Sequence, residues 1–542
     1  MVFCSLEFLV FFVVVAAVYW AMPSRWARAL FSAASAAYLG YKCWWLFAPS
    51  IAAGAGSFDA LTTVWASQPL GGELIWLATV VFLGAGLGWL AGRHRGRVWL
   101  LLAASFYFYA SWNAQLACLI FFSTILDYCL ARGIEKLKAG GWRKALVGVS
   151  VTANLGLLCY FKYTNFFLAS LQDALHRCGA ATSIPLLSIL APIGISFYTF
   201  EAINYIVDVY RGRVRVERNL ANFMLFILFF PHLVAGPIVR ARDFLPQIHR
   251  RKRWDWQRVL LGACFFLMGL FKKWVIADRM ALFSDPVFSH PGYYRATAVW
   301  MAVIAYALQI YCDFSGYTDM AIGVAHLFGY RLTKNFNMPY LSANITEFWR
   351  RWHISLSSWL RDYLFIPLGG SRGGRWMTYR NLLIVMTLGG LWHGASWTFV
   401  AWGVLHGLLL IGHRQFHDFC ERRPLWTRVL KSWPGTVVRA SCTFLSVSLC
   451  WIFFRSQSFS DATLMFKGLV RTHGLPAPMA AIGLTGTVAL VVVCHALGYN
   501  KRWERLFARI PAPVLGVGMA VVLALCLLFA PITDKPFIYF QF

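Results

Sequence analysis

Two histidines occupy polar stretches inside a sequence that is otherwise strongly apolar. His353 lies in WRRWHISLSSWLRD (residues 349–362), and His393 lies in LWHGASW (residues 391–397). An imidazole titrates near neutral pH, and burial favours its neutral, basic form. Beside a hydroxyl group, a neutral imidazole could remove the proton as the oxygen attacks an activated acyl group, a contribution worth roughly 10²–10⁴ in rate. The two histidines are therefore the candidate catalytic residues.

Each histidine also has a structural explanation that the sequence leaves open. His353 could be incidental to a helix that anchors the chain at a membrane surface, and His393 could be a core histidine whose ring bonds a backbone carbonyl. The second explanation is the weaker one, because Gly389, Gly390 and Gly394 interrupt the apolar run and an unneeded imidazole is costly there. The chain has no P-loop lysine motif and no HExxH pair, so nucleotide and zinc hydrolysis are not indicated and no metal site is predicted.

Other polar residues accompany the histidines. Asp313 and Asp319 interrupt an apolar stretch, where they could bind substrate or could equally pair with a basic or indole group. Glu201 and Asp208 are seven residues apart, hence on one helix face, and structural pairing explains them better, as it does His232. The candidate substrate-binding residues are Arg350, Arg351, Trp352, Trp392, Asp313 and Asp319.

The elements that must position these residues can be read from local patterns. A helix is predicted to begin at Asn344, because Glu347 stands where a capping box places its carboxylate. Along residues 348–363 apolar rings recur on one face, and arginine, serine and aspartate recur on another. This pattern is typical of an amphipathic helix in the membrane interface. His353 would then lie near the boundary between the faces and could point into a cytoplasm-facing funnel.

Composition identifies the class of protein. Of the 542 residues, 59% are hydrophobic and only 13% are charged, and the mean hydropathy is +0.59, whereas soluble domains carry about 25% charged residues. We therefore predict an all-α, polytopic membrane protein that forms one unit over residues 1–542. The net charge of +28 is spread over short basic clusters between apolar runs, as in cytoplasmic loops, so no nucleic-acid partner is predicted. The thirteen cysteines are scattered without a CxxC pair, which indicates packing residues.

Counting basic clusters places both termini outside and reveals two segments that cannot be simple crossings. Residues 220–238 separate two basic clusters that should both lie on the cytoplasmic side. About thirty apolar residues before Arg414 likewise separate two basic clusters that should both be cytoplasmic. Two prolines and a glycine break the first segment, and Gly389, Gly390 and Gly394 fall at the middle of the second, so each is predicted to be re-entrant, the second with His393 near its apex. The first run, residues 8–18, has no basic residue before it and is predicted to be a retained span. In all, about twelve spans are expected. Those after the first broken segment lie near 258–280, 297–329 (either one long helix or a broken one), 440–456, 479–498 and 513–531.

These motifs together resemble the membrane-bound O-acyltransferase family, in particular its alginate O-acetyltransferase branch. WHISLS at 352–357 combined with LWHG at 391–394 is a specific pattern. Matching stretches cover most of residues 190–410 and the two ends, whereas residues 42–96 match nothing in the branch. The resemblance implies a central tunnel open to both membrane faces, with the two family histidines at His353 and His393. We accordingly expect a catalytic core at 190–410 followed by C-terminal helices at 411–542.

The resemblance also implies an acyl relay across a bacterial inner membrane, within membrane lipid. Acetyl groups would come from a cytoplasmic donor, acetyl-CoA, with no bound cofactor, and pass to periplasmic acetyltransferase partners that modify an exopolysaccharide such as alginate. Arg350, Arg351 and Arg361 could meet the donor's phosphates. His393 would be the general base, and His353 would orient a group or share the proton work at a different depth of the passage. Cellulose or another polymer, D-alanyl transfer of the teichoic-acid type, and a transporter or flippase without chemistry remain open.

Overall fold

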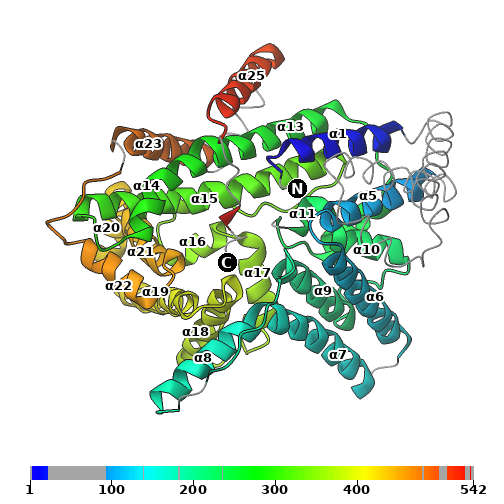
Figure 1. The fold of residues 1–542 in the computed structure, drawn as a ribbon, viewed down its shortest axis with the longest axis horizontal. Coiled ribbons are helices and arrows are strands. Elements are labelled where there is room, and N and C mark those ends of the chain that lie inside the picture. The colour runs from blue at the N-terminus through cyan, green and yellow to red at the C-terminus, as the bar shows by residue number, and fades with distance from the viewer. Residues whose placement is uncertain are drawn as a thin grey trace, which may run out of the picture.

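The chain folds into a helical assembly in the computed structural model (Figure 1), which describes residues 3–21, 93–137, 140–180, 183–234, 236–478, 481–499, 510–531 and 537–538. Within these ranges the regular structure is helical apart from one isolated bridge between Tyr294 and Leu475, which confirms the all-α class. Up to residue 341 the helices, with η marking π or 3₁₀ turns, are α1 (Leu6–Ala21), α5 (Arg93–Ala110), α6 (Ala114–Lys136), α7 (Gly141–Leu158), η1 (Cys159–Tyr163), α8 (Thr164–Arg177), α9 (Ile195–Tyr210), α10 (Leu220–Leu228), α11 (Phe230–Leu233), α12 (Ala241–His249), α13 (Trp256–Phe271), η2 (Lys272–Ala277), α14 (Asp278–Ser289), α15 (Ala296–Leu327) and η3 (Pro339–Leu341). The later ones are α16 (Ile345–Arg351), α17 (Ile354–Leu360), η4 (Arg361–Phe365), α18 (Gly374–His393), α19 (Trp397–Glu421), α20 (Pro424–Lys431), α21 (Trp433–Arg455), α22 (Phe459–Gly468), α23 (Ala481–Gly498) and α25 (Ala512–Leu528).

Several helices have the length and composition of membrane spans. In the described part of the chain, five continuous helical segments qualify: Ala114–Lys136, Gly141–Arg177, Trp256–Ser289, Ala296–Leu327 and Trp433–Arg455. The apolar helices α1, α23 and α25 are shorter. The spans expected near 258–280, 440–456, 479–498 and 513–531 thus coincide with helices, and 297–329 forms one unbroken helix of 32 residues. Most of the stretch 42–96, which matches nothing in the family branch, lies outside the described residues.

Helix α15 is the centre of the core. In its apolar 18-residue stretch, 72% of the residues are buried, whereas the corresponding share is 17–33% in the other four long segments. Its tightest partner is α13, because two pairs of glycines face each other: a Cβ built on Gly269 would lie 2.4 Å from the carbonyl oxygen of Gly316, and one on Gly323 would lie 2.6 Å from that of Gly262. Small residues at such a crossing let two backbones approach, which is how helices associate in lipid.

The first broken segment has the expected form. Helix α10 ends at Leu228, α11 adds a single turn at Phe230–Leu233, and an extended stretch leads to α12. Nearly all of this segment is buried, which is what a re-entrant segment would require. Glu201 stabilises it: its carboxylate lies 3.2 Å from His232 Nε2 and accepts a hydrogen bond from Val239 N at 2.7 Å. The structural explanation of Glu201 and His232 is therefore confirmed.

Candidate active site

His353 lies at a break between α16 and α17, where the sequence predicted one continuous helix. Its backbone is left-handed, with φ 43° and ψ 55°, a conformation that is uncommon outside glycine. Asn335 supports the break: its carbonyl accepts from Ile354 N at 2.8 Å, and its side chain accepts from Ser355 N at 3.2 Å. The predicted surface helix is therefore wrong at this point, since the break turns His353 inward and leaves it 0% exposed.

The predicted start of this helix is confirmed. Asn344 Oδ1 accepts a hydrogen bond from Glu347 N at 2.8 Å, and Glu347 Oε2 accepts one from Ala343 N at 3.0 Å. The two side chains thus satisfy backbone donors at the first turn, where no intrahelical carbonyl is available. The local signal was sufficient for the beginning of α16, but not for its early end.

His393 is the last residue of α18, at a turn between two packed helices. Gly394 is extended, and α19 begins after Ser396, whose side chain accepts from Thr398 N. The helices can approach because a Cβ on Gly390 would lie 2.2 Å from the carbonyl oxygen of Phe399. The predicted break with His393 at its apex is confirmed, although the legs, at 20 and 25 residues, are longer than expected.

The structure brings the two histidines together. Their ring centroids are 6.1 Å apart, and both side chains are buried. Trp392 contacts both rings, at 5.9 Å from His353 and 4.9 Å from His393, and its indole N–H donates to the carbonyl of Ser196 at 3.1 Å. Phe314 of α15 closes the other side of His353 at 4.7 Å. The prediction of two separate depths is therefore wrong, because the break at His353 carries its ring to the end of α18.

Sequence reasoning missed another buried histidine close to this pair, His406 on α19. Its ring packs between Trp402 at 4.7 Å and Trp349 at 5.2 Å, and Trp402 also contacts His393 at 5.2 Å. Neither ring nitrogen of His406 bonds to a described residue. The signal was present in the sequence, since His406 interrupts the apolar run of α19.

Lys162 is the second residue that the sequence reasoning missed. It lies in the π turn η1, inside the apolar segment Gly141–Arg177. Its amino group donates to the carbonyl oxygens of Trp392 and His393 at 2.7 and 3.0 Å. A lysine within an apolar span is expensive and by default functional, so its position alone could have drawn attention to it.

The predicted arginine and tryptophan ligands occupy different environments. Arg350 is exposed, whereas Arg351 pairs with Glu347 at 2.9 Å. Trp352 is buried against Phe336 at 5.0 Å and Trp451 at 5.1 Å. Of the six candidate substrate-binding residues, Trp392 is the one whose ring contacts both histidines.

Asp313 and Asp319 each pair with a lysine of η2. Lys273 lies 2.7 Å from Asp313 and 3.0 Å from Asp278, and Lys272 lies 2.5 Å from Asp319. The other oxygen of Asp313 accepts from the backbone N–H of Ile538 at 2.8 Å. The aspartates thus tie α15 to η2 and to residues 537–538, and Phe314 contacts both Phe537 at 5.8 Å and His353 at 4.7 Å.

A basic cluster surrounds Tyr363 in η4, directly after α17. The hydroxyl of Tyr363 donates to Asp208 at 2.7 Å, and Arg240 lies both near its ring and 2.7 Å from Asp362. Arg361, proposed to meet phosphates, also pairs with Asp362 at 2.7 Å. The structural explanation of Asp208 is confirmed.

Replacing Asp362 by asparagine is expected to lower the melting temperature at neutral pH but not in acid. Burial raises the pKa of Asp362, but hydrogen bonds from Arg361 and Arg240 outweigh it and hold that pKa below its usual value. A carboxylate whose pKa is lower in the folded state than in the unfolded state stabilises the fold at any pH above its unfolded pKa, near 3.9. That contribution is lost as the pH falls through the folded pKa. Melting curves of wild type and Asp362→Asn should differ at pH 7 and converge as the pH falls below the unfolded pKa, near 3.9, and through the lower folded pKa. A constant difference would contradict the assignment.

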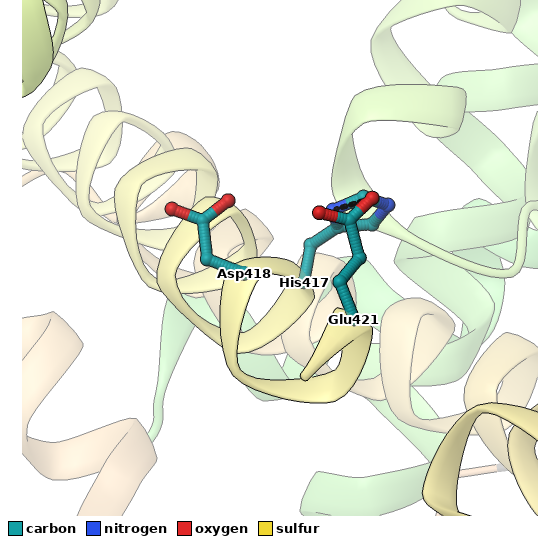
Figure 2. A group of neighbouring side chains, drawn as sticks. All are labelled: His417, Asp418 and Glu421. Atoms are coloured by element: carbon teal, nitrogen blue, oxygen red, sulfur yellow. Dashed lines mark ion pairs between the residues drawn. The ribbon is translucent and has the colours of Figure 1, made fainter. Parts of the chain in front are cut away.

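Two further patterns have other structural roles in this fold. His417, Asp418 and Glu421, near the end of α19, have metal-ligand chemistry and are drawn in Figure 2. The carboxylate of Asp418 pairs with Arg375 at 3.5 Å, and Glu421 pairs with His417 at 3.6 Å. Residues 369–373 read GGSRG, the spacing of a serine nucleophile motif, but they form an exposed turn before α18 and not the strand-to-helix turn that this motif needs.

Comparison with known proteins agrees with this geometry. A sequence model of the membrane-bound O-acyltransferase family matches residues 213–455, which include both histidines. A probable alginate O-acetylase AlgI of Pseudomonas syringae pv. tomato is 42% identical over 423 residues, 77% of this chain and 78% of the relative. A peptidoglycan O-acetyltransferase of Helicobacter pylori is 37% identical, covering 70% and 74% of the two chains. A teichoic acid D-alanyltransferase of Bacillus subtilis is 28% identical, covering 50% and 70%.

Proposed function

Because this chain belongs to the membrane-bound O-acyltransferase family, we propose that it is a membrane O-acetyltransferase serving an exopolysaccharide, with His393 and His353 at its reaction centre. The observation that carries the proposal is the meeting of the two buried imidazoles, 6.1 Å apart, at the end of α18. The similarity to alginate O-acetylases favours acetyl as the acyl group and alginate or a similar polymer as the final acceptor.

The chemistry follows from the neutral state of buried imidazoles. His393 takes the proton of an acceptor hydroxyl while that oxygen attacks the carbonyl carbon of the donor thioester. The new C–O bond forms, the C–S bond breaks, and the imidazolium returns the proton to the leaving thiolate. His353 orients the acceptor or stabilises the imidazolium. Aromatic rings around both histidines exclude water, which protects the thioester from hydrolysis.

The donor and the route are part of the same proposal. Acetyl-CoA is the donor, and its phosphates meet the exposed arginines at the ends of α16 and α17, Arg350 and Arg361 among them. The broken helices around the two histidines support a tunnel, from which the acetyl group passes to periplasmic acetyltransferase partners. About twelve spans in a bacterial inner membrane, with both termini periplasmic, complete the arrangement. Residues 190–410 form the catalytic core and residues 411–542 the C-terminal helices.

The test uses the full chain in proteoliposomes. Acetyl-CoA labelled in the acetyl group is supplied on one side, and a hydroxyl-bearing acceptor, such as an oligomannuronate, is supplied on the other together with the periplasmic acetyltransferase partner. We expect free CoA to be released in step with acetylated acceptor. Passage of label without thioester cleavage would instead establish a transporter. Transfer from a D-alanyl carrier thioester but not from acetyl-CoA would establish D-alanyl chemistry, for which the similarity to the teichoic acid D-alanyltransferase is the supporting observation.

A further inference from the structure

The end of α18 is held by side chains from a segment that lies about 230 residues earlier in the chain. Tyr163 donates its hydroxyl to the carbonyl of Leu391 at 2.9 Å. Lys162 donates to the carbonyls of Trp392 and His393 at 2.7 and 3.0 Å. Three successive carbonyls at the end of one helix are therefore bonded by two successive residues of another.

This contact replaces the usual cap of a helix end. The last carbonyls of an α-helix have no intrahelical partner and are commonly satisfied by a following glycine in the left-handed conformation. Gly394 follows α18 but is extended, with φ −156° and ψ 148°, so it does not form that cap. Lysine can bond the last carbonyls from the side, and here Lys162 does so from a neighbouring element.

Lys162 also links the end of α18 to α9, the third element of the site. Its amino group lies 3.4 Å from the hydroxyl of Ser196, and the indole of Trp392 donates to the carbonyl of Ser196 at 3.1 Å. Lys162 thus bonds the backbone of Trp392 and His393 directly and contacts the residue that holds the Trp392 ring. It belongs to a π turn, a feature that is rare and often found at functional sites.

We propose that Lys162 is a positioning residue for acyl transfer, which fixes the end of α18 so that His393 faces His353. This inference rests on the proposed function, because positioning matters only if His393 takes part in the reaction. Lys162 acts through the backbone and does not touch the reacting atoms. Misplacement of a catalytic group by about 1 Å can cost on the order of 10²-fold in rate, so the expected effect falls on kcat.

The experiment compares Lys162→Met, Lys162→Arg and the exposed control Lys144→Met in the full chain in proteoliposomes. In Lys162→Met we expect kcat to fall by about 10- to 100-fold while KM for acetyl-CoA changes by less than about threefold. Lys162→Arg, which keeps the donors, should recover at least half of the loss on a logarithmic scale, and Lys144→Met should match wild type. If Lys162→Met does not accumulate, Lys162→Gln, which keeps an amide donor, takes its place with an intermediate kcat expected.

A second measurement does not depend on turnover. Diethyl pyrocarbonate labels accessible histidines, and mass spectrometry of the 393 peptide reports its rate. We expect the rate at His393 to rise in Lys162→Met and to return toward wild type in Lys162→Arg. An unchanged rate together with unchanged kcat would overturn the inference, as would an equal loss in Lys162→Arg. His393→Ala is measured alongside: if that variant retains full activity, the proposed role of His393 fails, whereas the labelling result still judges the positioning by Lys162.

Discussion

Replacing His393 by alanine is expected to lower kcat for acetyl transfer by about 10²–10⁴-fold, the range in which general-base catalysis contributes. The imidazole is buried beside His353 and at the end of α18, so no exposed group can take over its proton. KM for acetyl-CoA should change little, because the donor's phosphates bind elsewhere. The measurement is acetyl transfer by the purified variant, together with the acetyl content of the exported polymer at matched protein level.

The controls separate catalysis from folding. His417→Ala changes an exposed histidine on α19 and should leave kcat at the wild-type level. His353→Ala should lower kcat as well, but by less than His393→Ala, since His353 orients or shares the proton. The opposite order would exchange their roles. Activity of His393→Ala above about a tenth of wild type would exclude it as the general base.

Replacing Lys273 by methionine is expected to destabilise the fold by about 3–5 kcal/mol, the cost of leaving a buried charge without its partner. Lys273 pairs with both Asp278 and Asp313, and their side chains are 7%, 10% and 4% exposed. Its loss leaves two carboxylates inside an apolar helical segment. The expected result is a clear fall in the midpoint of thermal unfolding in detergent, with less folded protein in the membrane.

Two comparison variants test the cause of that loss. Lys273→Met combined with Asp313→Asn should recover part of the stability, because one of the stranded charges is removed. Arg218→Met breaks the exposed pair between Arg218 and Glu135 and should leave the unfolding midpoint nearly unchanged, since exposed ion pairs contribute little. If all three variants melt alike, the buried pair is not what holds η2 to α15.

Much of the fold follows from local patterns. The alternation of apolar runs and basic clusters predicted an all-α membrane protein, and prolines and glycines marked the breaks at α10–α11 and after α18. The start of α16 was predictable because Asn344 and Glu347 satisfy donors within a few residues of themselves. These features can be predicted from nearby residues alone, because they do not depend on which other elements pack against them.

The arrangement of the site did not follow from local patterns. The motif around His353 has the periodicity of a continuous surface helix, yet Asn335 bonds the backbone at residues 354–355 and the helix breaks there. Asp313 and Asp319 could have been ligands or ion pairs, and only the position of η2 decided for ion pairs. In each case the deciding partner is distant in the sequence or lies on another element.

The sequence by itself determined which residues are chemically unusual: two histidines in an apolar chain, one of them, His393, beside a predicted break, within motifs of an acyltransferase family. Only the tertiary structure decided that these imidazoles share one location, that His406 lies beside them behind Trp402, and that Lys162 holds the end of α18. The physical reason is that burial cost and helix periodicity are properties of neighbouring residues in the chain. The cap on His393 comes from a lysine about 230 residues away, and no local periodicity encodes such a contact.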